Sequence, residues 1–362
     1  MTYPILDVNM ETIRSNARII MELCGEHGIE PAAVIKGFNA MPRIMDVIVG
    51  EGYKCLASSR IPHLRAIREA GYPVLTMGLR IPMRSEAEDV VRYCDISLES
   101  ELETINLLNG EAERRKVVHK IILMRDLGDL REGIIESERF VDTACLVEKN
   151  LPNIELLGVG SNLSCYGSVR PTAKNLSVLA GDAVEIERLI GRRLDVVSGG
   201  ASTSIPLLVR GEMPRGINHL RVGGALMHRV EIFGLRDDEL PGLSDDTFIL
   251  RAEIIEIGEK PTYPIGELAV DCFGNAGSYE DRGLRRRALL AVGAFDIASF
   301  EKISPLDSGA RILGCSSDHM IVDIHDSDRL YRLGGTMEFR LRYQSMLWAT
   351  ANGMIEKNYR AS

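Results

Sequence analysis

The stretch KIILMRDLGDLREG, residues 120–133, shows the pattern that decides the fold. A short apolar run, Lys120–Arg125, passes directly into a loop of glycine and charged residues. Short runs rich in Val, Ile and Leu are typical of parallel strands that are buried on both faces. The charged residues that follow Arg125 therefore lie at the carboxyl end of a predicted strand.

The same pattern recurs through the first two thirds of the chain. The other predicted strands are Ala33–Ile35, Lys54–Ser58, Val74–Met77, Ile96–Leu98, Ile154–Gly160, Asp195–Ser198 and His219–Val222. Stretches with helical periodicity separate them, among them Ile61–Glu69, Ser137–Lys149 and Leu176–Ile190. Eight such units in about 190 residues predict an α/β fold, a closed (β/α)8 barrel of the TIM type.

The pattern changes after about residue 230, where apolar runs alternate with clusters of Gly, Pro, Asp and Ser. The runs are Phe248–Ile257, Leu268–Asp271, Arg287–Val292, Met320–Ile324 and Met337–Leu341. They predict a mainly β domain, which a helix over Gln344–Lys357 closes. We expect a barrel over residues 1–228 and a C-terminal β domain over residues 229–362. Whether the first residues join the second domain stays open.

The composition excludes several classes of protein. The chain has 362 residues, of which 45% are hydrophobic and 26% charged, as is typical of globular proteins. The net charge of −9 argues against a nucleic-acid partner, because phosphates need basic patches. No apolar run approaches the ~20 residues that span a bilayer, so we expect no membrane segment.

The N-terminus and the cysteines indicate the compartment. The opening MTYPILDVNMETIRSN lacks a basic stretch followed by an apolar core, so we expect no signal peptide. The seven cysteines have no paired spacing, which is typical of reduced thiols in the cytoplasm. The sequence has no CxxC, no HExxH and no helically spaced histidine pair, so no metal site is predicted.

Chemically active side chains follow several predicted strands. In a parallel barrel the active site lies at the carboxyl ends of the strands. Lys36 follows the first strand, Arg131 lies in the loop after the fifth, Asn162 follows the sixth and Arg221 lies on the eighth. A lysine beside a dry barrel interior has a lowered pKa, which suits Schiff-base chemistry. The alternative is a strand-end lysine whose ammonium group reaches solvent.

Two glycine-rich turns predict a phosphate site. Ser198–Ser204 stands between a strand and a helix, where free backbone N–H groups and the helix dipole favour an anion. Ser202 and Thr203 add hydroxyl donors, and Gly223 with Gly224 forms the second turn. The alternative is a helix N-cap with tight-turn glycines.

Together these segments resemble the alanine-racemase-like family (fold type III) of pyridoxal 5′-phosphate (PLP) enzymes, which have a barrel and a C-terminal β domain. The resemblance covers essentially the whole chain. The matching motifs are Ile5–Asn9, Val34–Lys36, Gly128–Gly133, Arg221–Leu226 and Ser316–Asp323. Three segments are most similar to ornithine and lysine racemases, namely Asp126–Gly133, Val197–Ser204 and Pro264–Asn275.

The resemblance implies roles for the residues at the strand ends. Lys36 holds PLP and serves one face of the substrate Cα. Arg221 meets the pyridine nitrogen, with an ion pair to a neighbouring strand as the alternative. Arg131 contacts the cofactor or the substrate carboxylate, with a surface capping role as the alternative. Asn162 replaces a family histidine near the cofactor ring. The rest of the expected cofactor site is Ser202, Thr203, Gly223, Gly224 and Tyr343.

The chain also departs from the family at three positions. The tyrosine that serves as second acid/base in alanine racemases falls on Ala294, in Val292–Asp296. The tyrosine four residues after the PLP lysine falls on Ala40, and the modified lysine falls on Met124. These departures point away from alanine as the substrate and toward another second acid/base.

The second acid/base is expected from the C-terminal domain of a partner subunit. The candidates are Cys272, Tyr279, Asp318, His319 and Tyr343, of which Tyr279 and His319 are preferred. Asp318 also carries the charge that the side-chain ammonium of ornithine or lysine needs. The alternatives are a buried apolar Cys272, a plain loop histidine at His319 and packing roles for the two tyrosines.

We therefore predict a cytoplasmic homodimer with shared active sites that racemises a free basic amino acid, ornithine or lysine, with PLP as cofactor. Three alternatives stay open: an alanine or broad-specificity racemase, a non-catalytic PLP carrier, and a PLP aldolase or decarboxylase of the same two-domain plan.

Overall fold

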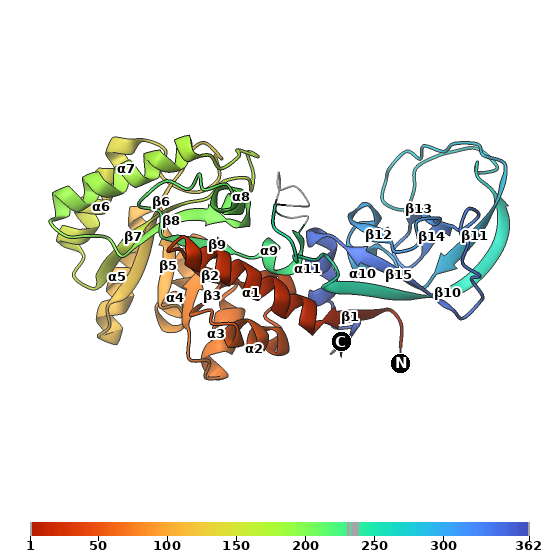
Figure 1. The fold of residues 1–362 in the computed structure, drawn as a ribbon, viewed down its shortest axis with the longest axis horizontal. Helices are drawn as coiled ribbons and strands as arrows, with labels where there is room; N and C mark the ends of the chain where they lie inside the picture. The colour runs from red at the N-terminus through yellow and green to blue at the C-terminus, as the bar shows by residue number, and fades with distance from the viewer. Residues whose placement is uncertain (1, 230–231, 233–238, 361–362) are drawn as a thin grey trace. The chain divides into compact units, whose positions relative to one another are not determined.

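The computed structural model describes residues 2–229, 232 and 239–360. The chain divides into two compact units, a barrel unit and a β unit (Figure 1). The barrel unit consists of Ile13–Lys36 and Ala40–Leu243. The β unit consists of Met1–Thr12, Gly37–Asn39 and Ser244–Ser362.

In the described part of the barrel unit, eight parallel strands close into a barrel in chain order. They are β2 (Glu30–Val34), β3 (Cys55–Ser58), β4 (Leu75–Gly78), β5 (Ile96–Glu99), β6 (His119–Arg125), β7 (Ile154–Ser161), β8 (Val196–Ala201) and β9 (His219–Val222). The pairing of β2 with β9 closes the ring and places Ala32 opposite Arg221. The predicted barrel is confirmed, although β2 ends at Val34 and Lys36 lies in the 3-10 turn η1 (Ile35–Phe38).

Helices follow most of the strands, and Figure 1 shows the long ones beside the barrel. They are α1 (Met10–Glu26), α2 (Pro42–Gly50), α3 (Ile61–Glu69), α4 (Ala87–Tyr93), α5 (Leu102–Arg115), α6 (Ser137–Asn150), α7 (Ala173–Ile190), α8 (Ile205–Val209) and α9 (Gly224–Met227). The helix α7 shows why such segments fold: Thr172 caps its first turn and Gly191 ends it at φ +73°. Its buried residues recur every three or four positions, as one helix face requires.

Alternating residues of the strands fill the barrel interior. The interior cluster consists of Ala32, Cys55, Ala57, Met77, Ile96, Leu98, Ile122, Met124 and Leu157. Successive side chains of a strand point to opposite faces, so Ser97 and Glu99 of β5 point away from this cluster. By the same alternation, Arg221 shares the interior face with Ala32, its neighbour on β2.

The β unit is a mainly antiparallel sheet built on the long strand β10 (Phe248–Pro261). Its other strands are β1 (Ile5–Asn9), β11 (Leu284–Leu290), β12 (Ile303–Pro305), β13 (Arg311–Cys315), β14 (Met320–Asp323), β15 (Thr336–Leu341) and β16 (Glu356–Arg360). Strand β1 pairs antiparallel with β10 and parallel with β16, so both ends of the chain belong to this sheet. The buried carboxylate of Asp7 receives Arg251 and Arg360 and links the three strands.

Two expectations for the β unit are wrong. Leu268–Asp271 is not a strand: it contributes only an isolated bridge between Val270 and Ala276. The Asp271 carboxylate accepts the N–H groups of Phe273 and Asn275 at 2.9 and 2.8 Å, which folds the chain into a turn instead. The expected helix Gln344–Lys357 ends early, as α11 (Tyr343–Ala351), because Glu356–Arg360 pairs with β1.

None of the described helices is long and apolar enough to cross a membrane. All seven cysteines lie in the described part of the chain, and each is a free thiol.

Candidate active site

Lys36 lies at the carboxyl end of the barrel, in the turn that follows β2. Its side chain is largely buried, and burial lowers the pKa of its amine. After burial, the next causes are Cys165, which in its ionised form acts to raise this pKa, and Arg131, which acts to lower it. The amine is therefore neutral in a larger fraction of molecules than a free lysine, which suits a nucleophile or base.

Arg221 is 4% exposed and points into the barrel from β9. Its Nη1 donates to the hydroxyl of Ser198, and its Nη2 donates to the carbonyl oxygen of Ser161 at 2.7 Å. No described carboxylate forms an ion pair with it, so the alternative role in a strand-to-strand ion pair is not what the structure shows. Burial lowers its pKa to about 10, which still leaves the guanidinium charged at neutral pH.

The hydroxyl of Ser198 connects Arg221 with His219. Its Oγ lies 2.8 Å from Nδ1 of His219. A guanidinium can only donate, so the Ser198 oxygen accepts from Arg221 and offers its own proton to His219. Burial lowers the pKa of His219 to about 3, which keeps its Nδ1 free to accept. Ser198 and His219 together fix the orientation of the Arg221 guanidinium.

The Ser202 hydroxyl and the backbone N–H groups of Gly223 and Ala225 meet at the turn after β9, an arrangement we call the Gly223 cradle. The Ser202 Oγ accepts the N–H groups of Gly223 and Ala225, each at 3.1 Å, at the start of α9. A Cβ on Gly223 would lie 2.9 Å from the Cβ of Val34, so only glycine fits between these strands. Thr203 donates instead to the carbonyl oxygen of Leu163 at 3.4 Å.

Asn162 follows β7 and has a buried amide nitrogen, Nδ2, without a hydrogen-bond partner among the described residues. A buried unpaired amide costs roughly 1–3 kcal/mol unless a bound group satisfies it. This nitrogen therefore indicates that something with an acceptor atom belongs in the site.

The loop after β6 carries Arg131, and the buried ion pair Arg125–Asp182 anchors it at 2.9 Å. Arg125 also donates to carbonyl oxygens at both ends of the loop, those of Asp126 and Ile134, at 3.0 and 2.7 Å. Arg131 itself is exposed and pairs with Glu132. The alternative role of Arg131 as a surface capping residue is not observed, because its guanidinium contacts Glu132 in the same loop.

Asp129 joins this loop to the loop after β7. It is 1% exposed, and its carboxylate accepts the N–H groups of Ser164, Cys165, Tyr166 and Val169 at 3.0–3.3 Å. Burial alone would raise the pKa of this carboxyl, but the four N–H groups outweigh burial and lower it. We call this arrangement the Asp129 clamp.

The remaining candidates lie in the β unit. Cys272 and Tyr279 are both exposed, so the expectation of a buried apolar cysteine is wrong. The ring of Tyr279 packs edge-to-face on Tyr263, with 6.2 Å between their centroids. Asp318 and His319 are exposed in the turn between β13 and β14. Tyr343 begins α11 and lies against Gly37. A Cβ added to Gly37 would be 3.4 Å from the Tyr343 ring.

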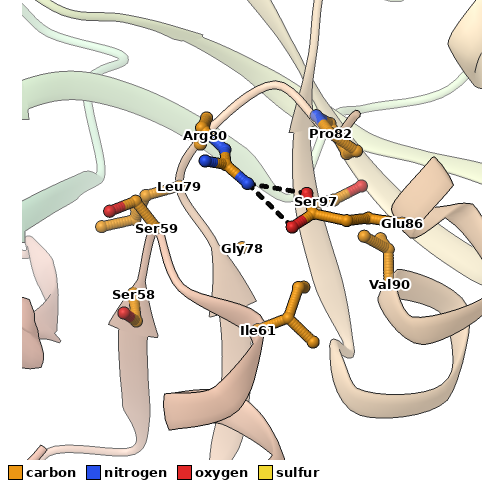
Figure 2. A pocket seen from close by; sticks show the side chains of 10 residues that line it. All are labelled: Ser58, Ser59, Ile61, Gly78, Leu79, Arg80, Pro82, Glu86, Val90 and Ser97. Atoms are coloured by element: carbon orange, nitrogen blue, oxygen red, sulfur yellow. Dashed lines mark hydrogen bonds and ion pairs between the residues drawn. The ribbon is translucent and has the colours of Figure 1, made fainter. Parts of the chain in front are cut away.

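Figure 2 shows a hollow lined by Ser58, Gly78, Arg80, Glu86 and Ser97, among others. Arg80 donates to both carboxylate oxygens of Glu86 at 2.8 Å across it. Ser97 points away from the barrel interior, so the hollow lies on the helix side of β5. It has room for about one water molecule and does not belong to the group around Lys36.

The barrel residues fit PLP. Lys36 offers a buried amine, Arg221 offers guanidinium donors, and Asn162 offers an unsatisfied amide. The Gly223 cradle offers a hydroxyl and two N–H groups, which donate to Ser202 here and would turn to a bound phosphate. The structure thus brings six of the predicted positions onto one barrel end: Lys36, Asn162, Ser202, Arg221, Gly223 and Gly224. Arg131 and Thr203 lie in the loops of the same end.

Sequence reasoning missed three residues of this site. Ser198 and His219 orient Arg221, and Asp129 fixes the loop that carries Cys165. Strand alternation could have placed Ser198 and His219 on the interior face beside Arg221. No sequence signal reveals the Asp129 clamp, because it depends on the contact between loops of two strands.

Comparison with known proteins agrees with this geometry. Residues 8–228 match the family described as alanine racemase, N-terminal domain. The chain is 42% identical to ornithine racemase of Acetoanaerobium sticklandii, over 98% of this chain and 99% of that protein. It is 34% identical to lysine racemase of Thermotoga maritima over the full length of both. Among solved structures, alanine racemase of Clostridium difficile 630 has the same fold, with a TM-score of 0.75, 17% identity, and 99% and 96% of the two chains covered.

Proposed function

The chain belongs to the alanine racemase family, and we propose that it interconverts the L and D forms of a free basic amino acid, ornithine or lysine, with PLP as cofactor. The likeness to an ornithine racemase and a lysine racemase along the whole chain supports this substrate class. The observation that carries the chemistry is the buried Lys36 amine at the same barrel end as Arg221 and the Gly223 cradle.

Racemisation removes the α-proton from one face of the substrate and returns a proton to the other face. PLP, when bound, supplies a conjugated system that takes up the electron pair of the broken C–H bond. Lys36 would hold the cofactor through its amine and then act as the base or acid on one face. Its lowered pKa supports its roles as the nucleophile that holds the cofactor and as the base, because each of these begins with the neutral amine.

Arg221 would face the ring nitrogen of the cofactor. Because its guanidinium stays charged and only donates, it would keep that nitrogen unprotonated. In this role Arg221 would favour the return of a proton to Cα over side reactions. The phosphate would take over the N–H groups of Gly223 and Ala225, which donate to Ser202 in this structure, and would bind the Ser202 hydroxyl, with Thr203 and Gly224 beside them.

The substrate has two charged groups besides the reacting centre. Arg131 would pair with its carboxylate, and an acidic side chain is needed for the distal ammonium. Asp318 is the candidate, since it is an exposed carboxylate in the turn that resembles the family motif. We also propose a homodimer in which a partner subunit presents this turn, with Tyr279, His319 or Cys272 nearby. The free thiols support a cytoplasmic location.

The test begins with purified protein reconstituted with PLP and screened against L- and D-amino acids for loss of optical rotation. Ornithine and lysine should racemise fastest. Lys36→Ala should remove the yellow colour of retained cofactor and lower turnover by at least about 10²–10⁴-fold, the usual contribution of an acid/base group.

Other outcomes separate the alternatives. A wild-type protein that binds no PLP would contradict the proposal outright. A protein that retains PLP but exchanges no α-hydrogen in D₂O would be a carrier. Glycine or an aldehyde among the products would indicate carbon–carbon bond cleavage, as in an aldolase.

A further inference from the structure

The loop after β7 brings a thiol to the mouth of the barrel. Cys165 is exposed and free, and its backbone N–H is held at 3.2 Å by the carboxylate of Asp129. Gly167 packs so closely that a Cβ there would lie 2.6 Å from the Asp129 carbonyl oxygen. The position of Cys165 is therefore fixed by the Asp129 clamp, although its side chain is exposed.

Cys165 affects the pKa values of three basic groups in the site. It has the largest charge effect on Lys36, and it also affects Arg131 and Arg221. Because Asp129 holds the Cys165 backbone and belongs to the loop that carries Arg131, the thiol lies at the barrel end that carries Arg131 and Lys36. The carboxylate of Glu132 also affects Lys36, but both of its oxygens are engaged by Arg131.

The topology places Cys165 across the mouth from Lys36. Lys36 follows β2, whereas Cys165 follows β7, which is three strands away around the closed ring through β9 and β8. The interior of an eight-stranded barrel is just wide enough for side chains to fill. Groups that enter from such well-separated strands approach a molecule at the mouth from different sides.

We propose that Cys165 is the second acid/base of the racemisation and acts across the barrel mouth from Lys36. The proposal rests on the proposed function. Ala294, which occupies the position of the family's tyrosine, has no proton to exchange. The barrel unit itself then supplies both acid/base groups.

The proton balance is simple. In one direction, the Lys36 amine or the Cys165 thiolate would take the α-proton, and the conjugated system that PLP supplies when bound would take up the electron pair of the C–H bond. The other group, in its protonated form, then delivers its proton to the opposite face, and the stored pair forms the new C–H bond. The two groups exchange protonation states in each turnover and return through solvent or the reverse reaction.

The first experiment measures α-hydrogen exchange in D₂O with PLP-loaded enzyme, separately for L- and D-ornithine. Cys165→Ala should lower racemisation by about 10²–10⁴-fold and abolish exchange of one enantiomer, while the other still exchanges through Lys36. Cys165→Ser, which keeps the size but not the acidity of the thiol, should behave in the same way. Cys145→Ala, a half-buried thiol on α6, is the matched control and should match wild type.

The second experiment does not depend on turnover. Alkylation of each cysteine by iodoacetamide is followed by peptide mass spectrometry, without ligand, with PLP, and with PLP plus ornithine. Ligands should slow alkylation of Cys165 by at least tenfold, about the effect of a site saturated tenfold above its Kd. The rate at Cys145 should not change.

The outcomes distinguish the two proposals. If wild type exchanges the α-hydrogens of neither ornithine nor lysine, the proposed function fails. If wild type racemises and Cys165→Ala exchanges both enantiomers at wild-type rates, or if ligands leave Cys165 alkylation unchanged, only the role of Cys165 is overturned.

Discussion

At the scale of single residues, Glu99 stands out because it is a fully buried carboxyl group outside the reaction chemistry. Its Oε1 accepts the hydroxyl of Ser97 at 2.6 Å, while its Oε2 has no partner among the described residues. Ser97 in turn lies 2.9 Å from Nε2 of His119. Burial raises the pKa of Glu99 to about 8 and lowers that of His119 to about 4, so both are neutral at pH 7.

This pKa predicts how stability depends on pH. Between pH 4.5 and about 8 folded Glu99 holds a proton that the unfolded chain has released, so the free energy of unfolding falls as pH rises. Glu99→Gln should remove this loss and be more stable than wild type at pH 8 by roughly 2–4 kcal/mol, with little difference near pH 4.5. Urea unfolding at pH 5 and pH 8 measures it.

The control is Glu138→Gln, the same substitution at an exposed carboxylate in the first turn of α6, which should not reproduce the gain at pH 8. A Glu99→Gln protein whose stability falls with pH as steeply as wild type would show that Glu99 ionises normally in the folded state.

At the scale of elements, the Asp129 clamp links the loops after β6 and β7. Four N–H groups of one loop converge on a single carboxylate of the other. Hydrogen bonds to a charged group contribute about 1.5–3 kcal/mol each. The clamp therefore holds in place two surface loops that would otherwise be expected to be mobile. Asp129 is a positioning residue: it acts through Arg131 and Cys165.

Removal of the clamp should affect turnover more than folding. Asp129→Ala should lower kcat by about 10²-fold with a smaller change in KM, because misplacement by about 1 Å has that effect. The amides of Ser164 and Tyr166 should lose protection from hydrogen exchange. Asp129→Asn, which keeps one acceptor oxygen, should recover part of both.

The exposed Asp142 on α6 supplies the control, since Asp142→Ala changes a carboxylate that holds no loop. Normal kcat in Asp129→Ala, despite loss of amide protection, would mean that the order of this loop is irrelevant to the chemistry.

At the scale of the whole molecule, the proposed homodimer divides the side chains of each active site between its two subunits. Lys36, Cys165 and Arg221 belong to the barrel unit, and Asp318 belongs to the β unit. In the proposed homodimer, one site takes the first three from one subunit and Asp318 from its partner. Sedimentation of active enzyme should then give a dimer.

Mixed dimers test this division. Lys36→Ala and Asp318→Ala subunits, dissociated and reassociated together, should regain about a quarter of wild-type activity, because half of the dimers are mixed and one site in each is intact. Lys36→Ala mixed with Cys165→Ala should regain none, since both changes affect the same barrel. An active monomer, or recovery in the second mixture, would contradict the arrangement.

The sequence alone determined the barrel, because buried parallel strands need continuous apolar runs and these are local. It also placed Lys36, Arg221 and the glycine turns at one barrel end, since every carboxyl end of a parallel barrel faces the same way. The expected helix over Gln344–Lys357 was wrong in its second half, since only pairing with β1, at the other end of the chain, makes Glu356–Arg360 a strand.

Only the tertiary structure decided how the loops meet. Asp129 and Ser164 are 35 positions apart, and nothing in either loop's own sequence requires their contact. The same holds for Ser198 and His219, which orient Arg221 from two strands. Strand position follows from local burial, whereas the hydrogen bonds of a loop depend on groups that folding brings near it. Lys36 could thus be identified from the sequence. The residues that position the groups around it, Asp129, Ser198 and His219, could be identified only from the fold.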